Sequence, residues 1–411
     1  MQETLSHYFG YKSFRPGQEE IITKILNHQH TLGVLPTGGG KSICYQVPGL
    51  MQGGTTIVIS PLISLMKDQV DQLQAMGIQA AYLNSSLTHK QQKEIEERIK
   101  RGAIQFLYVA PERFENTFFL NLLRKIKIPL IAFDEAHCIS KWGHDFRPSY
   151  QSVIQKVFTL PQSFTIVALT ATATAEVQQD IMSKLSIGQN DVVKTSTKRR
   201  NLIFKVNPTY QRQKFVVDYV ANHEGQAGII YCSTRKQVEE LHEALNSEKI
   251  KSTIYHAGLT NKERIEAQND FLYDRVEVVI ATNAFGMGID KSNVRYVIHY
   301  NMPGDLESYY QEAGRAGRDG LKSECILLFS ERDKGLHEYF ITVSQADDDY
   351  KDKMGEKLTK MIQYTKTKKC LEATIVHYFE PNENLEECNQ CSNCIPVSYT
   401  HLRAHETPEH L

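Results

Sequence analysis

Short apolar runs alternate with longer polar or amphipathic stretches over the first half of the chain. The runs occupy residues 31–35, 56–60, 106–110, 130–133 and 165–169. Apolar runs of this length, separated by stretches long enough for a helix, are typical of buried parallel strands with helical connections. The pattern therefore predicts a parallel sheet covered by helices on both faces.

The same alternation starts again in the second half of the chain. Its apolar runs occupy residues 227–232, 252–256, 276–281, 296–299 and 324–329. We therefore expect two similar α/β domains, joined near residues 195–207, where Lys198, Arg199 and Arg200 indicate a hinge. After Glu331 the strand pattern ends, and a polar, lysine-rich, helix-like region leads into a group of cysteines.

Length and composition agree with a protein of two or three globular domains. The chain has 411 residues, of which 41% are hydrophobic and 23% charged, and it is too long for one hydrophobic core. No apolar stretch approaches the roughly 20 residues that a membrane span needs, and no basic and apolar leader follows Met1. We therefore expect a cytoplasmic protein without membrane contact. The net charge of −1 offers no general attraction to nucleic acid, so such a function must rest on local features.

A glycine-rich segment directly after the first apolar run is typical of a phosphate-binding loop. It consists of Thr37, Gly38, Gly39, Gly40, Lys41 and Ser42. Glycines let the backbone curl until its N–H groups surround phosphate oxygens, and the helix that follows adds its positive end. Lys41 then reaches the β and γ phosphates, and the Ser42 hydroxyl binds Mg²⁺. The strict pattern has glycine where this chain has Leu35, and the alternative is a flexible turn.

Two adjacent acids, Asp134 and Glu135, end the apolar run at residues 130–133. The carboxyl ends of parallel strands are where α/β folds bind ligands. Asp134 would hold Mg²⁺, directly or through water, and Glu135 would orient and deprotonate the attacking water. Such acids can also cap helices, but the upstream glycine-rich loop favours the catalytic interpretation.

Two arginines of the second domain could stabilise the charge of a departing γ phosphate. Arg315 and Arg318 are three residues apart on a helix-like segment, so we expect them to share one face. Arginine suits this role because its planar group is always charged. The alternative is a pair of surface arginines bound to Glu312 and Asp319. In the catalytic interpretation, ATP lies between the two domains.

Five segments in this order resemble the motifs of superfamily 2 helicases. They are residues 14–18, 37–42, 134–137, 169–173 and 311–318. Residues 60–69, 138–148 and 284–291 narrow the resemblance to the RecQ DNA helicases. The resemblance covers nearly the whole chain and is specific, because many long motifs occur in the right order.

The resemblance implies two RecA-like motor domains with ATP and Mg²⁺ as cofactors. Further residues that it places at the nucleotide are Tyr11, Arg15, Gln18, Gly288 and Asp290. Gln18 would read the adenine edge, with which an amide can form two hydrogen bonds. Gln311 joins Arg315 and Arg318 in the catalytic set.

The segment around the single tryptophan is the candidate DNA contact. It contains Trp142, His144, Phe146 and Arg147. Aromatic side chains and arginine on a loop stack on unpaired bases, at about 1–3 kcal/mol per base. Trp142 and Phe146 could instead fill the core, but the glycine, proline and charged neighbours favour a loop. The resemblance implies that this loop senses single-stranded DNA and couples it to ATP hydrolysis.

Four cysteines gather near the end of the chain: Cys370, Cys388, Cys391 and Cys394. Four sulfurs at this spacing suit tetrahedral Zn²⁺. An iron–sulfur cluster or unliganded thiols are the alternatives, and the expected cytosolic location argues against disulfides. The resemblance implies a helical zinc module after the second motor domain.

The lysines before the cysteines have two interpretations. Lys357, Lys360, Lys366, Lys368 and Lys369 either contact DNA or form a solvated helix face. Leu371 and Glu372 stand where many relatives have basic residues, which argues against DNA contact at that place.

The expected organisation has four parts. Residues 1–203 form the ATP-binding domain, 204–338 the second motor domain and 339–395 the zinc module. Residues 396–411 lack a clear periodicity, so we expect a non-native tail or a truncated chain. RecQ helicases usually continue into a winged-helix domain and further helical parts. Without them we expect DNA-stimulated ATP hydrolysis to persist and unwinding to weaken.

The sequence thus predicts a monomeric, ATP-dependent 3′-to-5′ DNA helicase of RecQ type that acts in DNA repair and recombination. Its expected partners are single-stranded and partly duplex DNA, a single-stranded-DNA-binding protein, and recombination and repair factors. Two alternatives stay open. One is an RNA helicase with the same core, and the other is a nucleic-acid binding or annealing protein that ATP switches without turnover.

Overall fold

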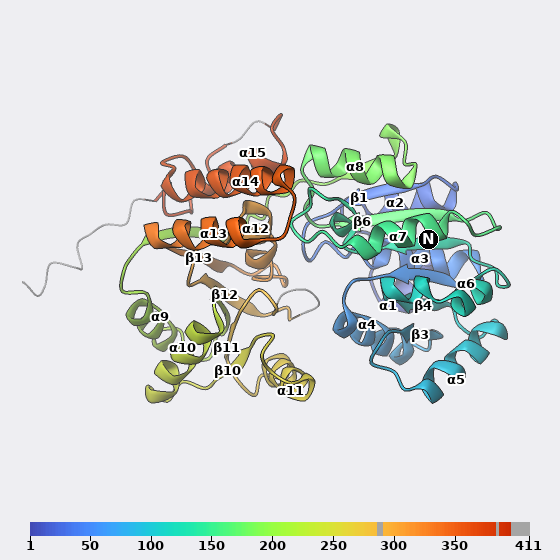
Figure 1. Cartoon of the computed structure of the whole chain (residues 1–411), viewed down its shortest axis with the longest axis horizontal. Coiled ribbons are helices and arrows are strands. Elements are labelled where there is room, and N and C mark those ends of the chain that lie inside the picture. Colours follow the sequence, from blue (N-terminus) through green and yellow to red (C-terminus); the bar gives the residue numbers. More distant parts are fainter. Residues whose placement is uncertain (286–290, 384–385, 396–411) are drawn as a thin grey trace, which may run out of the picture.

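The computed structural model describes residues 1–285, 291–383 and 386–395, with the backbone alone at residues 63 and 64. Two α/β lobes lie side by side, and a group of helices covers one side of the second lobe (Figure 1). No helix among the described residues is long and apolar enough to cross a membrane.

The first lobe is built on a parallel sheet of seven strands within the described residues, in the order β3-β4-β2-β5-β6-β1-β7. The strands are β1 (Thr31–Val34), β2 (Thr56–Ile59), β3 (Ala80–Leu83), β4 (Phe106–Val109), β5 (Leu130–Phe133), β6 (Thr165–Thr170) and β7 (Val192–Lys194). The α-helices are α1 (Gln2–Phe9), α2 (Gln18–Leu26), α3 (Ile43–Gln52), α4 (Ile63–Ala75), α5 (His89–Lys100), α6 (Thr117–Leu123), α7 (Pro148–Val157) and α8 (Ala175–Leu185). Short 3₁₀ helices occupy Pro111–Glu115, Ala136–Ile139 and Gln189–Asp191.

The second lobe is built on a parallel sheet of six strands within the described residues, in the order β10-β11-β9-β12-β13-β8. The strands are β8 (Leu202–Pro208), β9 (Ala227–Tyr231), β10 (Ser252–Tyr255), β11 (Val278–Ala281), β12 (Val294–His299) and β13 (Ser323–Phe329). The helices are α9 (Arg212–Ala221), α10 (Arg235–Ser247), α11 (Asn261–Leu272) and α12 (Leu306–Ala313).

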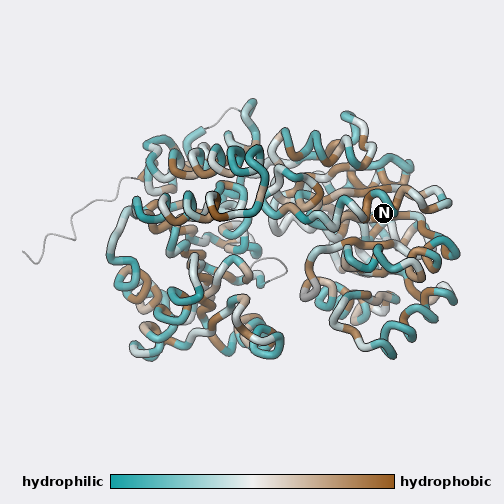
Figure 2. Tube along the Cα trace, in the orientation of Figure 1, coloured by the Kyte–Doolittle hydropathy of each residue, from teal (hydrophilic) through white to brown (hydrophobic). Residues whose placement is uncertain are grey.

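The inner strands β2, β5, β9 and β11 are buried at every position, which explains why they are apolar. In β2, Ile57 and Ile59 belong to one core cluster and Val58 to the cluster on the opposite face. Parallel strands covered by helices on both sides have this composition. Figure 2 shows hydrophobic segments gathered in the interior of each lobe, with polar residues on the outer helices.

Three further helices follow the second sheet: α13 (Glu331–Val343), α14 (Asp348–Lys366) and α15 (Leu371–Phe379). They share a core with it, since the rings of Tyr309 and Tyr364 lie 5.4 Å apart, as do those of Tyr310 and Phe379. Cys370 belongs to the same cluster. The helical module is therefore packed onto the second domain as one hydrophobic unit.

The predicted fold class is confirmed, but three strands were not predicted from the hydrophobic pattern. β3 contains two alanines, β7 is a three-residue edge strand, and β8 lies in the segment that resembles a hinge. Two expected domain boundaries fall inside regular elements, because β8 begins at Leu202 and α13 runs across residue 338.

Candidate active site between the two sheets

The phosphate-binding loop connects β1 to α3. Gly38 and Gly40 have φ angles of 79° and 73°, a region that other residues rarely adopt. A Cβ on Gly39 would lie 2.8 Å from the carbonyl oxygen of Pro36, so this position also requires glycine. Leu35, which replaces the glycine of the strict pattern, is buried in a core cluster of the first lobe. The replacement therefore lies in the core, before the curled part of the loop begins.

Gln18 and Arg15 bind the phosphate loop in this structure. The buried Gln18 amide nitrogen donates to the carbonyl oxygens of Gly39 at 3.1 Å and Gly40 at 2.9 Å. Its oxygen accepts from the Arg15 N–H at 2.8 Å, and the Arg15 guanidinium donates to the carbonyl of Gly38. To read the adenine edge, Gln18 must therefore exchange these bonds for contacts with the nucleotide.

The two predicted acids follow β5. Burial and the adjacent Glu135 carboxylate raise the pKa of Asp134 to about 7. Burial would also raise the pKa of Glu135, but the hydrogen bond to His137 and the charge of Lys41 lower it to about 2. Tyr150 donates to the Asp134 carbonyl at 3.1 Å and holds this turn. The two carboxyls thus titrate as a pair, in which Glu135 is ionised first and Asp134 keeps its proton to higher pH.

A cavity of about 390 Å³ joins these groups across the two lobes. The predicted nucleotide residues that line it are Tyr11, Arg15, Gln18, Thr37, Gly38, Gly40, Lys41, Ser42, Asp134, Glu135 and Arg318. The Thr37 hydroxyl is buried and has no hydrogen-bond partner among the described residues, as expected where a ligand supplies one. Gln69, which lies in the segment 60–69, and Ser292 also line the cavity, and neither was predicted individually from the sequence. Gly288 and Asp290 lie outside the described residues.

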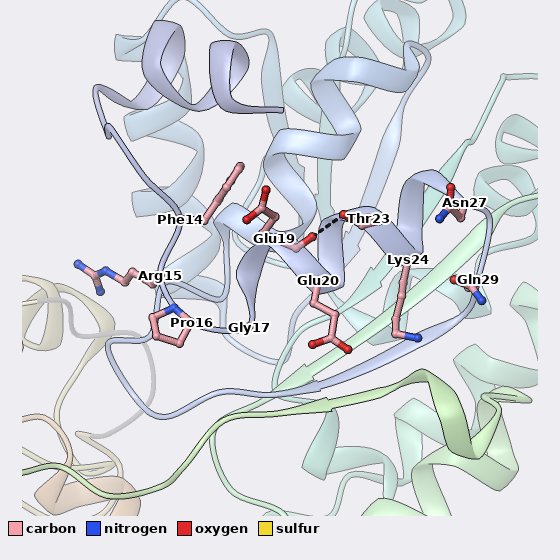
Figure 3. A pocket seen from close by; sticks show the side chains of 10 residues that line it. All are labelled: Phe14, Arg15, Pro16, Gly17, Glu19, Glu20, Thr23, Lys24, Asn27 and Gln29. Atoms are coloured by element: carbon pink, nitrogen blue, oxygen red, sulfur yellow. Dashed lines mark hydrogen bonds between the residues drawn. The ribbon is translucent and has the colours of Figure 1, made fainter.

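A wider hollow of about 860 Å³ lies along α2 and shares Arg15 with the nucleotide cavity (Figure 3). Its side chains come from residues 14–29 and include Glu19, Glu20 and Lys24. It contains neither the phosphate loop nor the paired acids. The smaller cavity is therefore the candidate for catalysis.

The two candidate arginines lie after the end of α12, not on one helical face as expected. Asp305 caps the start of α12 by accepting from the Ser308 N–H at 2.7 Å, and the helix ends at Ala313. Arg318 reaches the nucleotide cavity, and a Cβ on Gly38 would lie 3.5 Å from its Cγ. Arg315 is buried in the second lobe, beside Tyr231. Arg318 lines the cavity, whereas Arg315 is not among its lining residues.

Two stacked histidines connect Glu135 with the second lobe. His137 Nδ1 lies 3.3 Å from the Glu135 carboxylate, and its ring stacks on that of His144 with centroids 4.2 Å apart. His144 Nε2 donates to the Gln311 amide oxygen at 2.9 Å. Burial and the neighbouring His137 lower the pKa of His144 to about 3, so His144 is neutral. The predicted DNA contact His144 thus lies between two catalytic candidates in this structure.

Trp142 lies on the predicted loop and packs partly against the core of the first lobe. The ammonium groups of Lys141 and Lys353 lie 5.4 and 5.9 Å from its ring. Lys357 donates to the Trp142 carbonyl at 2.8 Å and pairs with Glu307 at 3.0 Å. Lys357 is buried, so neither interpretation of this lysine from the sequence is right. It connects the Trp142 loop with α12 and α14.

The end of the Trp142 loop is fixed by Arg147. Its guanidinium binds the Asp145 carboxylate at 2.9 Å and the carbonyl oxygen of Pro61, also at 2.9 Å. Phe146 is half-buried beside it. The loop is therefore tied to the segment that follows β2.

The four C-terminal cysteines come together, and their ligand atoms all lie within 4.8 Å of one another. The sulfur of Cys394 lies 3.5 Å from that of Cys391 and 3.9 Å from that of Cys388. Zn–S bonds of about 2.3 Å in a tetrahedron separate sulfurs by about 3.8 Å. The N–H of Cys388 donates to the Cys370 sulfur at 3.3 Å. This donor set fits Zn²⁺.

Three family models match consecutive parts of the chain. DEAD/DEAH box helicase matches residues 15–181, helicase conserved C-terminal domain matches 211–320, and RecQ zinc-binding matches 331–395. The first covers the phosphate loop and the acids, and the third covers the four cysteines. The predicted cofactors, ATP with Mg²⁺ and Zn²⁺, are thereby confirmed.

Curated relatives match nearly the whole chain. The ATP-dependent DNA helicase RecQ of Bacillus subtilis is 48% identical over 401 residues, covering 97% of this chain and 68% of the relative. The protein of the same name from Haemophilus influenzae is 42% identical over 400 residues, covering 97% and 64%. This chain thus spans about two thirds of the length of these relatives.

Solved structures share the arrangement of the two sheets. S. cerevisiae Dbp5 bound to RNA and ADP BeF3 has a TM-score of 0.67 and 20% identity, covering 87% of this chain and 97% of Dbp5. A likeness at this identity concerns the fold alone.

Proposed function

Because the chain belongs to the RecQ family of ATP-dependent DNA helicases, we propose that it hydrolyses ATP between its two sheets and uses this cycle to move along single-stranded DNA and unwind duplex DNA. The cavity between the lobes carries the proposal, since Lys41 and Glu135 line it from one lobe and Arg318 from the other. A nucleotide that contacts both lobes can couple hydrolysis to opening and closing of the cleft. The 3′-to-5′ direction rests on the family alone.

We assign the chemistry to groups of the first lobe. Lys41 binds the β and γ phosphates, and the N–H groups of the loop surround them. Ser42 and Asp134 hold Mg²⁺, which when bound neutralises phosphate charge. Glu135 is ionised at neutral pH and orients and deprotonates the attacking water.

We assign the second lobe to charge stabilisation and coupling. Arg318 approaches the γ phosphate as negative charge develops there. Arg315 and Gln311 remain the proposed catalytic partners of Arg318. Since His144 donates to Gln311, a base that stacks on Trp142 can act on Gln311 through this loop.

The finer predictions remain proposals. Since β8 and α13 are continuous elements, we propose domain boundaries just before Leu202 and Glu331. Trp142, His144, Phe146 and Arg147 are the proposed DNA contacts. A single-stranded-DNA-binding protein and recombination and repair factors are the proposed partners of a monomeric, cytoplasmic enzyme.

The test is the rate of ATP hydrolysis with single-stranded DNA, duplex DNA or RNA, with Glu135→Gln as the inactive control. We expect single-stranded DNA to stimulate the wild type most strongly and Glu135→Gln to be nearly inactive. Stimulation by RNA but not by single-stranded DNA would favour the RNA helicase. Equally slow hydrolysis by wild type and Glu135→Gln with DNA present would favour the ATP-switched binding protein.

A further inference from the structure

Arg199 connects the two lobes at the edge of the nucleotide cavity. It lies between β7 and β8, and its side chain is half-buried. The carbonyl oxygens within hydrogen-bond distance of its terminal nitrogens are those of Thr37, Gly314, Ala316 and Gly317, at 2.9, 3.4, 3.1 and 2.9 Å. Thr37 belongs to the phosphate loop, and the three others belong to the turn that carries Arg315 and Arg318. One guanidinium thus joins the phosphate loop to the arginine turn.

The main chain on both sides of Arg199 is anchored. The Thr197 N–H donates to the Glu380 carboxylate at 2.9 Å, and the Thr197 carbonyl accepts from the Tyr310 hydroxyl. On the other side, the Asn201 amide donates to the Gly317 carbonyl at 2.8 Å. Arg199 therefore reaches the phosphate loop from a fixed support.

Gly314 of the arginine turn also lies close to Thr37 of the phosphate loop, and the hydrogen bonds among the described residues include none between these two. A Cβ on Gly314 would lie 3.2 Å from the Thr37 hydroxyl oxygen. That hydroxyl has no hydrogen-bond partner among the described residues. The polar connection at this place comes from the guanidinium of Arg199, whose planar fork can donate to several carbonyls at once. A lysine carries the same charge but cannot span both sides in this way.

We propose that Arg199 is a positioning residue for ATP hydrolysis. It sets the distance between the phosphate loop and the arginine turn, so that Arg318 contacts the γ phosphate only when the two lobes are correctly placed relative to each other. This inference rests on the proposed function, since it assumes that the cavity hydrolyses ATP. It gives the connecting segment a role in the active site beyond that of a passive hinge.

The test compares Arg199→Lys with Arg200→Lys. Arg200 is the adjacent arginine and is exposed, so its replacement controls for the chemical change. With saturating single-stranded DNA, we expect Arg199→Lys to lower kcat roughly 10- to 100-fold, because misplaced groups cost rates of this order. The KM for ATP and the midpoint of thermal unfolding should change little, and Arg200→Lys should match the wild type.

A double-mutant cycle with Arg318→Ala separates positioning from a structural role. If Arg199 acts through Arg318, adding Arg199→Lys to Arg318→Ala causes no further loss of kcat. The inference would be overturned if the fold-losses in kcat of the two single variants multiply in the double variant. It would also be overturned if Arg199→Lys has the same kcat as Arg200→Lys. If Arg199→Lys does not fold, Arg199→Gln takes its place in the same cycle with Arg318→Ala, and the same two outcomes apply to its kcat. A wild type without DNA-stimulated hydrolysis would contradict the proposed function instead.

Discussion

Replacing Lys357 with methionine would remove a buried charge while keeping most of the side-chain volume. Lys357 and Glu307 are only 5% and 3% exposed, and their charged atoms lie 3.0 Å apart. Lys357 also donates to the Trp142 carbonyl at 2.8 Å. In Lys357→Met, the Glu307 carboxylate and the Trp142 carbonyl both lose the Lys357 ammonium as a hydrogen-bond donor.

The expected cost follows from that burial. Removing one partner of a buried ion pair costs about 3–5 kcal/mol of unfolding free energy, because the other charge stays buried. In a domain of 150–250 residues this corresponds to a midpoint of thermal unfolding lower by roughly 6–20 °C.

The loss should depend on pH. Burial already raises the pKa of Glu307, and the loss of Lys357 raises it further. A folded-state pKa above the unfolded value stabilises the fold at low pH, and this contribution is lost as pH rises through the folded-state pKa. Lys357→Met should therefore be destabilised more at pH 8 than at pH 5.

The assay is chemical and thermal unfolding of Lys357→Met at both pH values. Lys360→Met is the matched control, because Lys360 is exposed and lies 5.4 Å from the Tyr378 ring. The control should change the unfolding free energy by no more than about 1 kcal/mol. Adding Glu307→Gln to Lys357→Met should recover part of the loss. Equal stability of Lys357→Met and Lys360→Met at pH 8 would refute the reasoning.

Three further predictions concern the separate sites. Trp142→Ala should raise the DNA concentration for half-maximal ATPase stimulation about 5- to 150-fold, the equivalent of about 1–3 kcal/mol of stacking; an unchanged DNA titration would speak against base contact. Burial and Glu135 raise the pKa of Asp134 to about 7, so the proton should compete with Mg²⁺ below that pH. The apparent Mg²⁺ affinity in the ATPase assay should thus fall from pH 8 to pH 6, and a pH-independent value would contradict this. The purified protein should contain one equivalent of zinc, and Cys388→Ser should lose it and unfold at lower temperature; metal analysis that finds iron in its place would reject the zinc assignment.

Features that depend on neighbouring residues in the chain could be predicted from the sequence. The phosphate loop between β1 and α3 needs glycine at Gly38 and Gly40 because of their positive φ angles. Asp134 and Glu135 directly follow an apolar strand, so their place at the carboxyl edge of the sheet follows from the fold class. The cysteines were recognisable because their spacing matches tetrahedral ligation.

Features that depend on contacts between distant segments could not be predicted. Lys357 belongs to a lysine-rich region, and only packing against Glu307 and Trp142 distinguishes it from its exposed neighbours. Arg199 stands beside two other basic residues, and its carbonyl partners come from both lobes. Arg315 and Arg318 both follow the end of α12 at Ala313, so the helical spacing that the sequence indicates does not apply to them.

The central claim is that the two lobes form one ATPase site, and the rate of ATP hydrolysis by Arg318→Ala with single-stranded DNA tests it most directly. The arginine lies in the second lobe and lines the cavity that contains Lys41 and Glu135. An arginine on the transferred phosphate contributes about 10³- to 10⁵-fold in kcat. We predict that the wild type is stimulated by single-stranded DNA and that Arg318→Ala loses at least about 10³-fold in rate while staying folded. A folded Arg318→Ala enzyme that hydrolyses ATP as fast as the wild type would contradict the account.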